Sequence, residues 1–333
     1  MTLVVERTTR AGRIGAVAAV LLVAALVVLP WAGDAGLMRV VIELIALLVL
    51  AQMWNLLAGY AGLVSIGQQA YVGVGGYALI VLADDLGVNP FVAVPLAGLV
   101  AVAVALPTAA LVFRFRDAYF AVGTWAVAEV YRLLIANTPA LGRGTGRTLK
   151  AVFPLARETR ELVTYAIAVA IGVAALVAVY LYLRSRFGLG LMAVRDSEPA
   201  SESLGVDVYR TKLAVYLVAA FGTGTTGALI YLNLLRISPD AAFSINWTAY
   251  TIFSVVIGGL GTLEGPIVGT LVFFLLRELL ADYGSWYMIL LGTLAVLTMM
   301  RYPQGLWGLL AERWDVRLFP VQRRVRDAPA PER

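Results

Sequence analysis

The chain has 333 residues, of which 61% are hydrophobic and only 14% are charged, and it carries a formal charge of +5. A soluble domain has about 25% charged residues, so this composition excludes a water-soluble protein and predicts an integral membrane protein. The lack of cysteine and histidine excludes disulfides, thiol catalysis, and haem and zinc sites. The arginines lie near the ends and in the loops, which indicates contact with lipids and the orientation of the chain in the membrane, and no nucleic-acid partner.

The N-terminal segment resembles a secretory signal peptide. Arginines at positions 7, 10 and 13 precede an apolar run that ends near position 29. No cleavage site with small residues follows this run, and further apolar runs come directly after it. We therefore expect residues 14–31 to be retained as the first membrane helix, behind a cytoplasmic segment 1–13.

Hydropathy predicts an all-α, polytopic membrane protein with about ten spanning helices, because a span needs about 20 apolar residues. Three predicted spans are short or interrupted by glycine, so a count of eight or nine is the alternative. Together the spans form one transmembrane domain, 14–301, followed by a basic tail, 302–333. The predicted spans are 14–31, 38–57, 64–82, 90–113, 117–136, 161–183, 212–233, 247–260, 266–281 and 286–301.

Basic residues in short loops predict the orientation. With a cytoplasmic N-terminus, ten crossings place the turn at Arg114 and Arg116, the stretch 184–212 and the C-terminal tail in the cytoplasm. The loop 138–160 then lies outside, although it also holds several basic residues. Either this loop is an exception with a purpose, such as docking an external protein, or the count is wrong by one upstream; we favour the first. Its basic residues are Arg143, Arg147, Lys150, Arg157 and Arg160.

Two acidic residues, Glu43 and Glu129, lie near the middle of predicted spans, where ionised groups are usually functional or paired. Glu129 and Arg132 are three residues apart, so they share one helix face and can neutralise each other, which is the interpretation we favour. Glu43 lies in mid-helix without an obvious local partner, and Gln52 and Asn55 follow further along.

The segment 59–77 combines many glycines with polar side chains. Glycines in a span permit close helix packing or a broken helix, and unpaired backbone in lipid is tolerated only where protein or water satisfies it. We favour a partly unwound segment that lines a solute path; the alternative is a small-residue packing seam whose polar groups bond across helices. The relevant residues are Gly59, Gly62, Ser65, Gly67, Gln68, Gln69, Gly73, Gly75 and Gly76.

The segment 256–270 is the second interruption by glycine. Five glycines and a proline there predict a sharp turn between two short apolar runs, and Glu264 is its only charge. Transporters often place such breaks in both halves of the chain, around the translocation path. A tight hairpin near the cytoplasmic face is the alternative interpretation.

Mixed charges break the apolar pattern between 184 and 212. Glu198 suits the first turn of a short helix, because the positive end of the helix dipole stabilises a carboxylate. Pro199 suits the same turn, because the N–H group that proline lacks would have no partner within the helix there. Gly205 suits the position after the helix, where the left-handed conformation is needed. A short amphipathic helix can pass force from a soluble partner; an ordinary capped loop is the alternative.

No residues in the chain support enzymatic work. The sequence lacks a nucleophile with a neighbouring base, a pair of carboxylates at one depth in the membrane that could act as acid and base, and a cluster of metal-binding residues. Neither lysine, Lys150 or Lys212, lies in the glycine-rich loop that binds phosphates in ATPases. We therefore expect no cofactor in this chain; if ATP drives transport, separate subunits bind ATP and magnesium.

Several segments occur in an order that runs from residue 55 to 306. They are NLLAGYAGLVSIG at 55–67, DAYFAVGT at 117–124 with Glu129, FGLGLMAVRD at 187–196, SLGV at 203–206, YRTK at 209–212, GGLGTLEGPIVG at 258–269 and RYPQGL at 301–306. In these segments the chain resembles permease subunits of ABC importers for branched-chain amino acids, of the LivM type. The segment at 258–269 is the most specific.

The resemblance implies an importer in the inner membrane of a bacterium or archaeon. Such an importer contains two permeases, often unlike, two cytoplasmic ATP-binding subunits and an external solute-binding protein. By the same analogy, the segment from Arg195 to Gly205 is the coupling helix that docks into an ATPase groove. The residues expected to couple are Arg195, Asp196, Glu198, Ala200, Glu202, Leu204 and Gly205.

Two departures from the family pattern concern the solute. Gln68 stands where many relatives have histidine, so any role of that imidazole is absent. The stretch LGRGTGR at 141–147 is more basic than the polar stretch expected there, which puts the solute in doubt. The coupling segment also lies one residue off the strict spacing of other importer families, as it does in relatives of this type.

We therefore predict the permease subunit of an ATP-driven importer of branched-chain or related amino acids. The alternatives are the same machinery carrying urea, short-chain amides or small organic acids, or an ion-coupled carrier that works alone. The predicted path residues are Asn55, Gly59, Gly62, Ser65, Gly67, Gln68, Gln69, Glu129, Gly258, Gly259 and Gly261.

Overall fold

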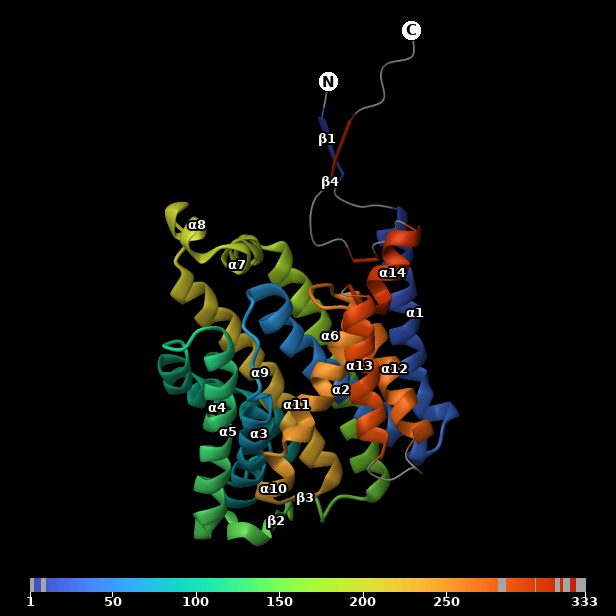
Figure 1. Ribbon diagram of the computed structural model, residues 1–333. Coiled ribbons are helices and arrows are strands. Elements are labelled where there is room, and N and C mark those ends of the chain that lie inside the picture. The colour runs from blue at the N-terminus through green and yellow to red at the C-terminus, as the bar shows by residue number, and fades with distance from the viewer. Residues whose placement is uncertain are drawn as a thin grey trace.

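The computed structural model describes residues 3–6, 10–280, 286–302, 304–314, 318–319 and 324–327. Its helices form a bundle, with short strands at the two ends (Figure 1). The α-helices are α1 (Arg10–Ala32), α2 (Ala35–Ala61), α3 (Gln68–Ile80), α4 (Pro90–Val112), α5 (Asp117–Asn137), α6 (Arg157–Arg184), α7 (Arg186–Asp196), α8 (Glu198–Ser203), α9 (Val208–Leu234), α10 (Pro239–Ala242), α11 (Ile245–Gly258), α12 (Glu264–Leu280), α13 (Trp286–Arg301) and α14 (Gly305–Trp314).

Shorter elements complete the described chain. They are a π-helix, η1 (Val81–Asp85), which continues α3; the 3-10 helices η2 (Pro139–Leu141) and η3 (Arg143–Thr145); and the strands β1 (Leu3–Glu6), β2 (Arg147–Thr148), β3 (Arg236–Ile237) and β4 (Arg324–Asp327). The strands pair antiparallel, β1 with β4 and β2 with β3.

The prediction of an all-α polytopic membrane protein is confirmed. Each predicted span coincides with a helix, and seven helical segments of the described chain are long and apolar enough to cross a membrane. The other three helices, α3, α12 and α13, have 13, 17 and 16 residues. The count of ten crossings therefore stays a prediction.

Some predicted boundaries are wrong. The span 64–82 was placed too early, because residues 62–67 lie outside any helix and α3 begins only at Gln68. Six helices begin two to four residues earlier than predicted, namely α1, α2, α6, α9, α11 and α12. Of these, α6 starts within the predicted outer loop, and α9 starts within the predicted inner stretch. Asp207 explains the second change, since its side chain caps α9 by accepting the N–H of Arg210 at 2.9 Å.

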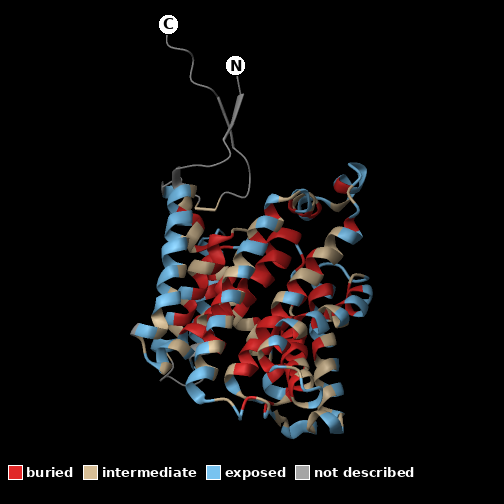
Figure 2. Ribbon diagram, turned by 180° about the vertical axis from the view of Figure 1, so that it is seen from behind, coloured by how far each residue is buried: buried red, intermediate tan, exposed pale blue. Residues whose placement is uncertain are grey.

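Helix α2 lies at the centre of the bundle, and buried residues concentrate there in the view of Figure 2. A helix that is apolar on all sides is expected to be buried, and most residues of α2 from Val41 to Ala61 are. Helix α1 is mostly exposed and lies at the edge (Figure 1), where the Tyr165 hydroxyl of α6 donates to the Leu26 carbonyl at 2.7 Å. The central position of α2 lets it contact both helix breaks.

Helices α3, α4 and α9 meet along small residues. A Cβ added at Gly75 would lie 1.9 Å from the Gly224 carbonyl oxygen, and one at Gly224 would lie 2.3 Å from the Cβ of Ala101. The backbones therefore touch, as in other membrane helix pairs with small residues at the interface. This part of the glycine-rich segment is a packing seam, as the alternative interpretation predicts.

The two ends of the bundle differ. Strands β1 and β4 and helices α7, α8 and α14 lie at one end, here called the terminal end, and β2, β3 and α10 lie at the other, here called the loop end (Figure 1). The basic loop 138–160 and the stretch 184–212 therefore lie at opposite ends, as the predicted orientation requires.

The predicted basic tail, 302–333, contains α14 and β4. Between them, the Phe319 N–H donates to Glu264 Oε1 at 2.7 Å, which brings the tail against the start of α12. Strand β4 places Arg324 opposite Glu6 of β1. Residues 303, 315–317, 320–323 and 328–333 of this tail lie outside the described residues.

The glycine seam generates a stability prediction. We expect Gly75→Ala to lower the free energy of unfolding by about 1–3 kcal/mol, because the new methyl group overlaps the backbone of α9. Gly144→Ala is the matched control, since a Cβ there meets nothing within 4 Å. Thermal unfolding of the purified protein in detergent measures both variants, and equal melting temperatures would contradict the seam.

Candidate translocation path and coupling segment

The first helix break carries the chain from the end of α2 back along that helix. Gly62 ends α2 in the left-handed conformation, with φ of 71°, and the N–H groups of Gly62 and Leu63 both donate to the Leu57 carbonyl. The Trp54 indole N–H donates to the Ser65 carbonyl at 2.8 Å. Because Trp54 lies about two turns before the end of α2, the chain has by then returned into the bundle.

Helix α5 supplies partners for the rest of this break. The Ile66 N–H donates to the Thr124 hydroxyl at 3.1 Å, and the Gly67 N–H donates to the Ser65 hydroxyl at 3.2 Å. A Cβ at Gly67 would lie 2.3 Å from the Thr124 carbonyl oxygen, so only glycine permits this approach. Irregular backbone is tolerated at membrane depth when protein satisfies it in this way.

Helix α3 begins inside the bundle with two buried glutamines. Gln68 Nε2 donates to Thr223 of α9 at 2.6 Å, and Gln69 Oε1 accepts the hydroxyl of Thr248 of α11. We call these four residues and Ser65 the polar belt; all five are buried. Their amide and hydroxyl groups can exchange hydrogen bonds with a polar solute without leaving a charge unpaired, but here they bond to one another or to nearby backbone, so the belt is closed.

The second break, the turn 259–263 between α11 and α12, is held by polar side chains of α2. Asn55 Oδ1 accepts the Gly261 N–H at 2.9 Å, and Asn55 Nδ2 donates to the Thr262 carbonyl at 2.8 Å. One turn earlier on α2, Gln52 Nε2 donates to the Leu263 carbonyl at 2.8 Å. A single side of α2 therefore holds the turn, because residues three apart share a helix face.

Glycines let the neighbouring backbones approach this turn. A Cβ at Gly59 would lie 2.6 Å from the Gly261 nitrogen, so α2 and the turn touch. A Cβ at Gly258 would lie 1.8 Å from the Gly265 carbonyl oxygen, which brings the ends of α11 and α12 together. A Cβ at Gly259 would lie 2.6 Å from the carbonyl oxygen before α14, at Gln304. The turn is therefore the meeting point of four helices.

Arg195 links this region to the stretch 184–212. Its Nη1 donates to the Gly59 carbonyl at 3.0 Å, while its Nε and Nη2 donate to Asp196. The Gly59 carbonyl is one of the last four of α2, which have no partner within the helix. A guanidinium is also favoured at the negative end of a helix dipole. The bond fixes the end of α7 to the end of α2.

The prediction of one helix from Arg195 to Gly205 is wrong in its extent. Helix α7 ends at Asp196, and a separate helix, α8, begins at Glu198. Ser197 separates them, because its side chain turns to the new helix and accepts the Ala200 N–H at 3.4 Å. Arg195 and Asp196 thus belong to α7, and the other predicted coupling residues belong to α8 or its C-terminal cap.

The predicted ends of the short helix are confirmed. Pro199 lies in its first turn, and Gly205 follows its end with φ of 84°. The Val206 N–H donates to the Ser201 carbonyl at 3.0 Å, the bond that characterises a left-handed helix stop. Glu198 forms an ion pair with Lys212 of α9, which fixes the start of α8.

The two acidic residues predicted in mid-span, Glu43 and Glu129, are each paired with an arginine. Arg132 bonds to Glu129 at 2.5 Å and to Asp240 of α10 at 2.6 Å, so the pairing interpretation of Glu129 is confirmed. Glu43 has a partner that the sequence did not reveal, since Arg277 of α12 lies 2.7 Å away. Within the described residues, no group of three or more acidic side chains could hold a metal ion.

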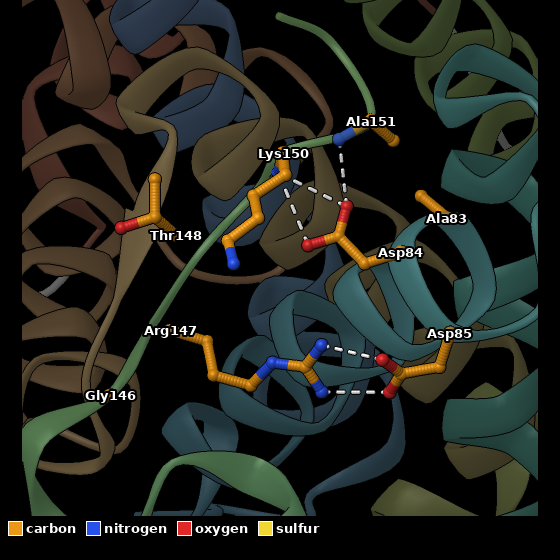
Figure 3. Close-up of a pocket in the computed structure, with 8 residues that line it drawn as sticks. All are labelled: Ala83, Asp84, Asp85, Gly146, Arg147, Thr148, Lys150 and Ala151. Atoms are coloured by element: carbon orange, nitrogen blue, oxygen red, sulfur yellow. Dashed lines mark hydrogen bonds and ion pairs between the residues drawn. The ribbon is translucent and has the colours of Figure 1, made fainter.

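At the loop end, the basic loop is anchored to the end of η1 (Figure 3). Arg147 forms two hydrogen bonds with Asp85, at 2.6 and 2.7 Å, and these bonds lower the pKa of the Asp85 carboxyl and raise the pKa of Arg147. The Asp84 carboxylate accepts the N–H groups of Lys150 and Ala151, at 2.8–3.1 Å. The loop therefore has a fixed shape, which its basic composition did not predict.

Known proteins that are similar to this chain in sequence are permeases of transport systems. The profile of the family described as "Branched-chain amino acid transport system / permease component" matches residues 36–299. The chain is 27% identical over 278 residues to the high-affinity branched-chain amino acid transport system permease protein LivM of Salmonella typhimurium and to that of Escherichia coli. These alignments cover 76% of this chain, which spans only 65% of the length of either relative.

A third relative comes from an archaeon. It is the probable branched-chain amino acid transport permease protein LivM of Methanocaldococcus jannaschii, 26% identical over 101 residues, which cover 30% of this chain and 29% of the relative. No solved structure matches the chain.

The turn 259–263 generates a local prediction. In Asn55→Leu, the Gly261 N–H and the Thr262 carbonyl lose their partner, which costs about 1–3 kcal/mol for each buried group. We expect faster amide hydrogen exchange in the turn, measured by mass spectrometry, and a lower melting temperature. Asn137→Leu is the matched control, because Asn137 is exposed and bonds only within its own helix. Unchanged exchange in the turn of Asn55→Leu would show that α2 does not hold it.

Proposed function

The chain belongs to the family of permease components of branched-chain amino acid transport systems, and from this membership we propose that it forms the membrane path of an ATP-driven importer. Curated relatives are named as branched-chain amino acid permeases, which supports branched-chain or related amino acids as solutes. We further propose that the chain lies in the inner membrane of a bacterium or archaeon, with its terminal end in the cytoplasm.

The proposed importer has several partner subunits. Since no phosphate-binding loop occurs in the sequence, two cytoplasmic subunits bind ATP and magnesium and hydrolyse the nucleotide. A second permease completes the path, a solute-binding protein delivers the solute at the loop end, and lipids surround the exposed apolar helices. The chain itself catalyses no reaction.

The polar belt and the two helix breaks form the proposed path. A zwitterion that passes them meets amide, hydroxyl and backbone groups, which hydrogen-bond both of its ends without attracting either one strongly. Broken helices are typical of transporter solute sites, and the first break leads directly into the belt through Ser65 and Gln68. The belt is closed in the described conformation, so transport requires α3, α9 and α11 to separate there.

The Arg195–Gly59 bond is the observation that carries the proposal of ATP coupling. It joins the 184–212 stretch to α2, and α2 holds the turn 259–263 through Asn55. The exposed side of α8 faces away from the bundle, with Leu204 81% exposed, and we assign it the ATPase contact. Movement of α8 then reaches the turn through α7 and Arg195.

The structure disfavours an ion-coupled carrier that works alone. Such a carrier needs titratable groups in its path, but Glu43 and Glu129 are each half exposed on the bundle surface and paired with an arginine. The same importer carrying urea, short-chain amides or small organic acids is distinguished by the solute that the cognate binding protein retains.

Reconstitution tests the proposed function. We expect proteoliposomes with this chain, its partner permease, both ATPase subunits and the binding protein to take up leucine, isoleucine or valine only when ATP is supplied. ATPase subunits with inactivated nucleotide sites are the control. Uptake of urea or amides in preference would establish the alternative solute, and uptake without ATP would overturn the proposal.

Arg195→Gln tests the coupling route. We expect ATP hydrolysis and complex assembly to persist while solute transported per ATP falls by about tenfold, because a charge-assisted hydrogen bond contributes about 1.5–3 kcal/mol. Arg195→Lys, which keeps a donor, should recover part of the ratio. Solute uptake and phosphate release measured on the same proteoliposomes give this ratio.

Arg210→Gln is the matched control for this experiment. Arg210 is an exposed arginine of the neighbouring α9 and pairs only with Asp207, so its loss should leave the ratio unchanged. A normal ratio in Arg195→Gln would contradict transmission through Arg195. Loss of ATPase binding in that variant would instead make Arg195 a docking residue and would also overturn this route.

A further inference from the structure

A cavity of about 670 Å³ opens at the loop end of the bundle. Its lining comes from the end of η1 and from the basic loop, and Figure 3 shows their charged side chains facing one another. The lining residues are Ala83, Asp84, Asp85, Gly146, Arg147, Thr148, Lys150 and Ala151. With two carboxylates and two cations, the cavity has no net formal charge but separated charges of both signs.

Most of these charged groups already have structural partners. Asp85 bonds to Arg147, and Asp84 accepts two backbone N–H groups of the loop. The Lys150 ammonium differs, because within the described chain it makes no ion pair or hydrogen bond. Its own backbone is fixed by Asp84, so the ammonium group is tethered beside the cavity.

We propose that this cavity is a reception site for the zwitterionic head of a free α-amino acid. The carboxylate of the amino acid bonds to the Lys150 ammonium and the Thr148 hydroxyl. Its ammonium group bonds to the free lone pairs of Asp84 and Asp85, at the negative end of the helix formed by α3 and η1. The proposal deepens the proposed function, on which it rests.

The mixed charges of the cavity favour a zwitterion over an ion that carries a charge of one sign. An inorganic anion would meet Lys150 but also two carboxylates, and a bare cation would meet two carboxylates but also Arg147 and Lys150. A ligand with both charges satisfies both sets, so a zwitterion binds best. The lining has no large apolar side chain, and the amino-acid side chain therefore contributes little to binding.

The site lies on the same helix as the polar belt. Asp84 and Asp85 end the helical segment that begins at Gln68 and Gln69. An amino acid released by the binding protein at the loop end is thus held beside the helix that leads into the bundle. Side-chain selectivity then resides in the binding protein, and this site recognises only the part common to all α-amino acids.

Ligand binding to the intact permease complex in nanodiscs, without the binding protein, tests the site. Saturation-transfer NMR gives dissociation constants for L-leucine, glycine, N-acetyl-L-leucine and L-leucine amide. We expect leucine and glycine to bind alike, and the two analogues that keep a single charge to bind at least about tenfold more weakly. Equal binding of leucine and N-acetyl-leucine would overturn the proposal.

Lys150→Gln supplies the residue-level test. The substitution keeps the backbone N–H that Asp84 accepts, so the loop retains its anchor, and we expect leucine to bind at least about tenfold more weakly. Arg143→Gln is the matched control, because Arg143 belongs to the same loop but does not line the cavity. Wild-type affinity in Lys150→Gln would overturn the proposal.

Two further arms separate the alternatives. Nanodiscs with and without phosphatidylethanolamine show whether a zwitterionic lipid headgroup displaces leucine; complete displacement assigns the cavity to lipid and overturns the proposal. ATP-driven uptake is measured separately with the binding protein present. Uptake without saturable leucine binding at the cavity refutes this site alone, whereas binding without ATP-driven uptake refutes the proposed function.

Discussion

The need to satisfy every backbone hydrogen-bonding group inside a membrane governs this structure. Helices meet that need internally, but residues 62–67 and 259–263 do not lie in helices. Side chains of α2 meet it for both segments: Trp54 binds the first, and Gln52 and Asn55 bind the second. Two breaks far apart in the chain are therefore held by one buried helix, and any displacement of α2 is felt at both.

This arrangement explains why α2 combines polar side chains with nearly complete burial. Gln52 and Asn55 would be costly in an apolar core without partners, and the turn 259–263 accepts a hydrogen bond from each side-chain amide nitrogen. The C-terminal end of the same helix presents the Gly59 carbonyl, to which Arg195 donates. The mechanical connection between α7 and the turn thus follows from ordinary helix capping, with no dedicated linker.

The sequence predicted what depends on local pattern and missed what depends on distant partners. Apolar runs located the helices, and the Pro199 and Gly205 positions located the ends of α8 correctly. The extent of the coupling helix was wrong, because the capping preference of Ser197 outweighed helix continuity. The Glu43–Arg277 pair joins α2 to α12, and no spacing rule within one helix could have revealed it.

The described structure separates charge from the path. Glu264 is the only charged side chain among its buried residues, and it lies at the start of α12, beside the tail. The polar belt has only neutral amides and hydroxyls, so proton uptake within the belt cannot drive its opening. In the proposed function, the force that opens the belt therefore comes from outside it, through hydrogen bonds that join one helix to the next. The Arg195–Gly59 bond and the Asn55 bonds join α7 to the turn 259–263 through α2, and they are the route that we propose for coupling.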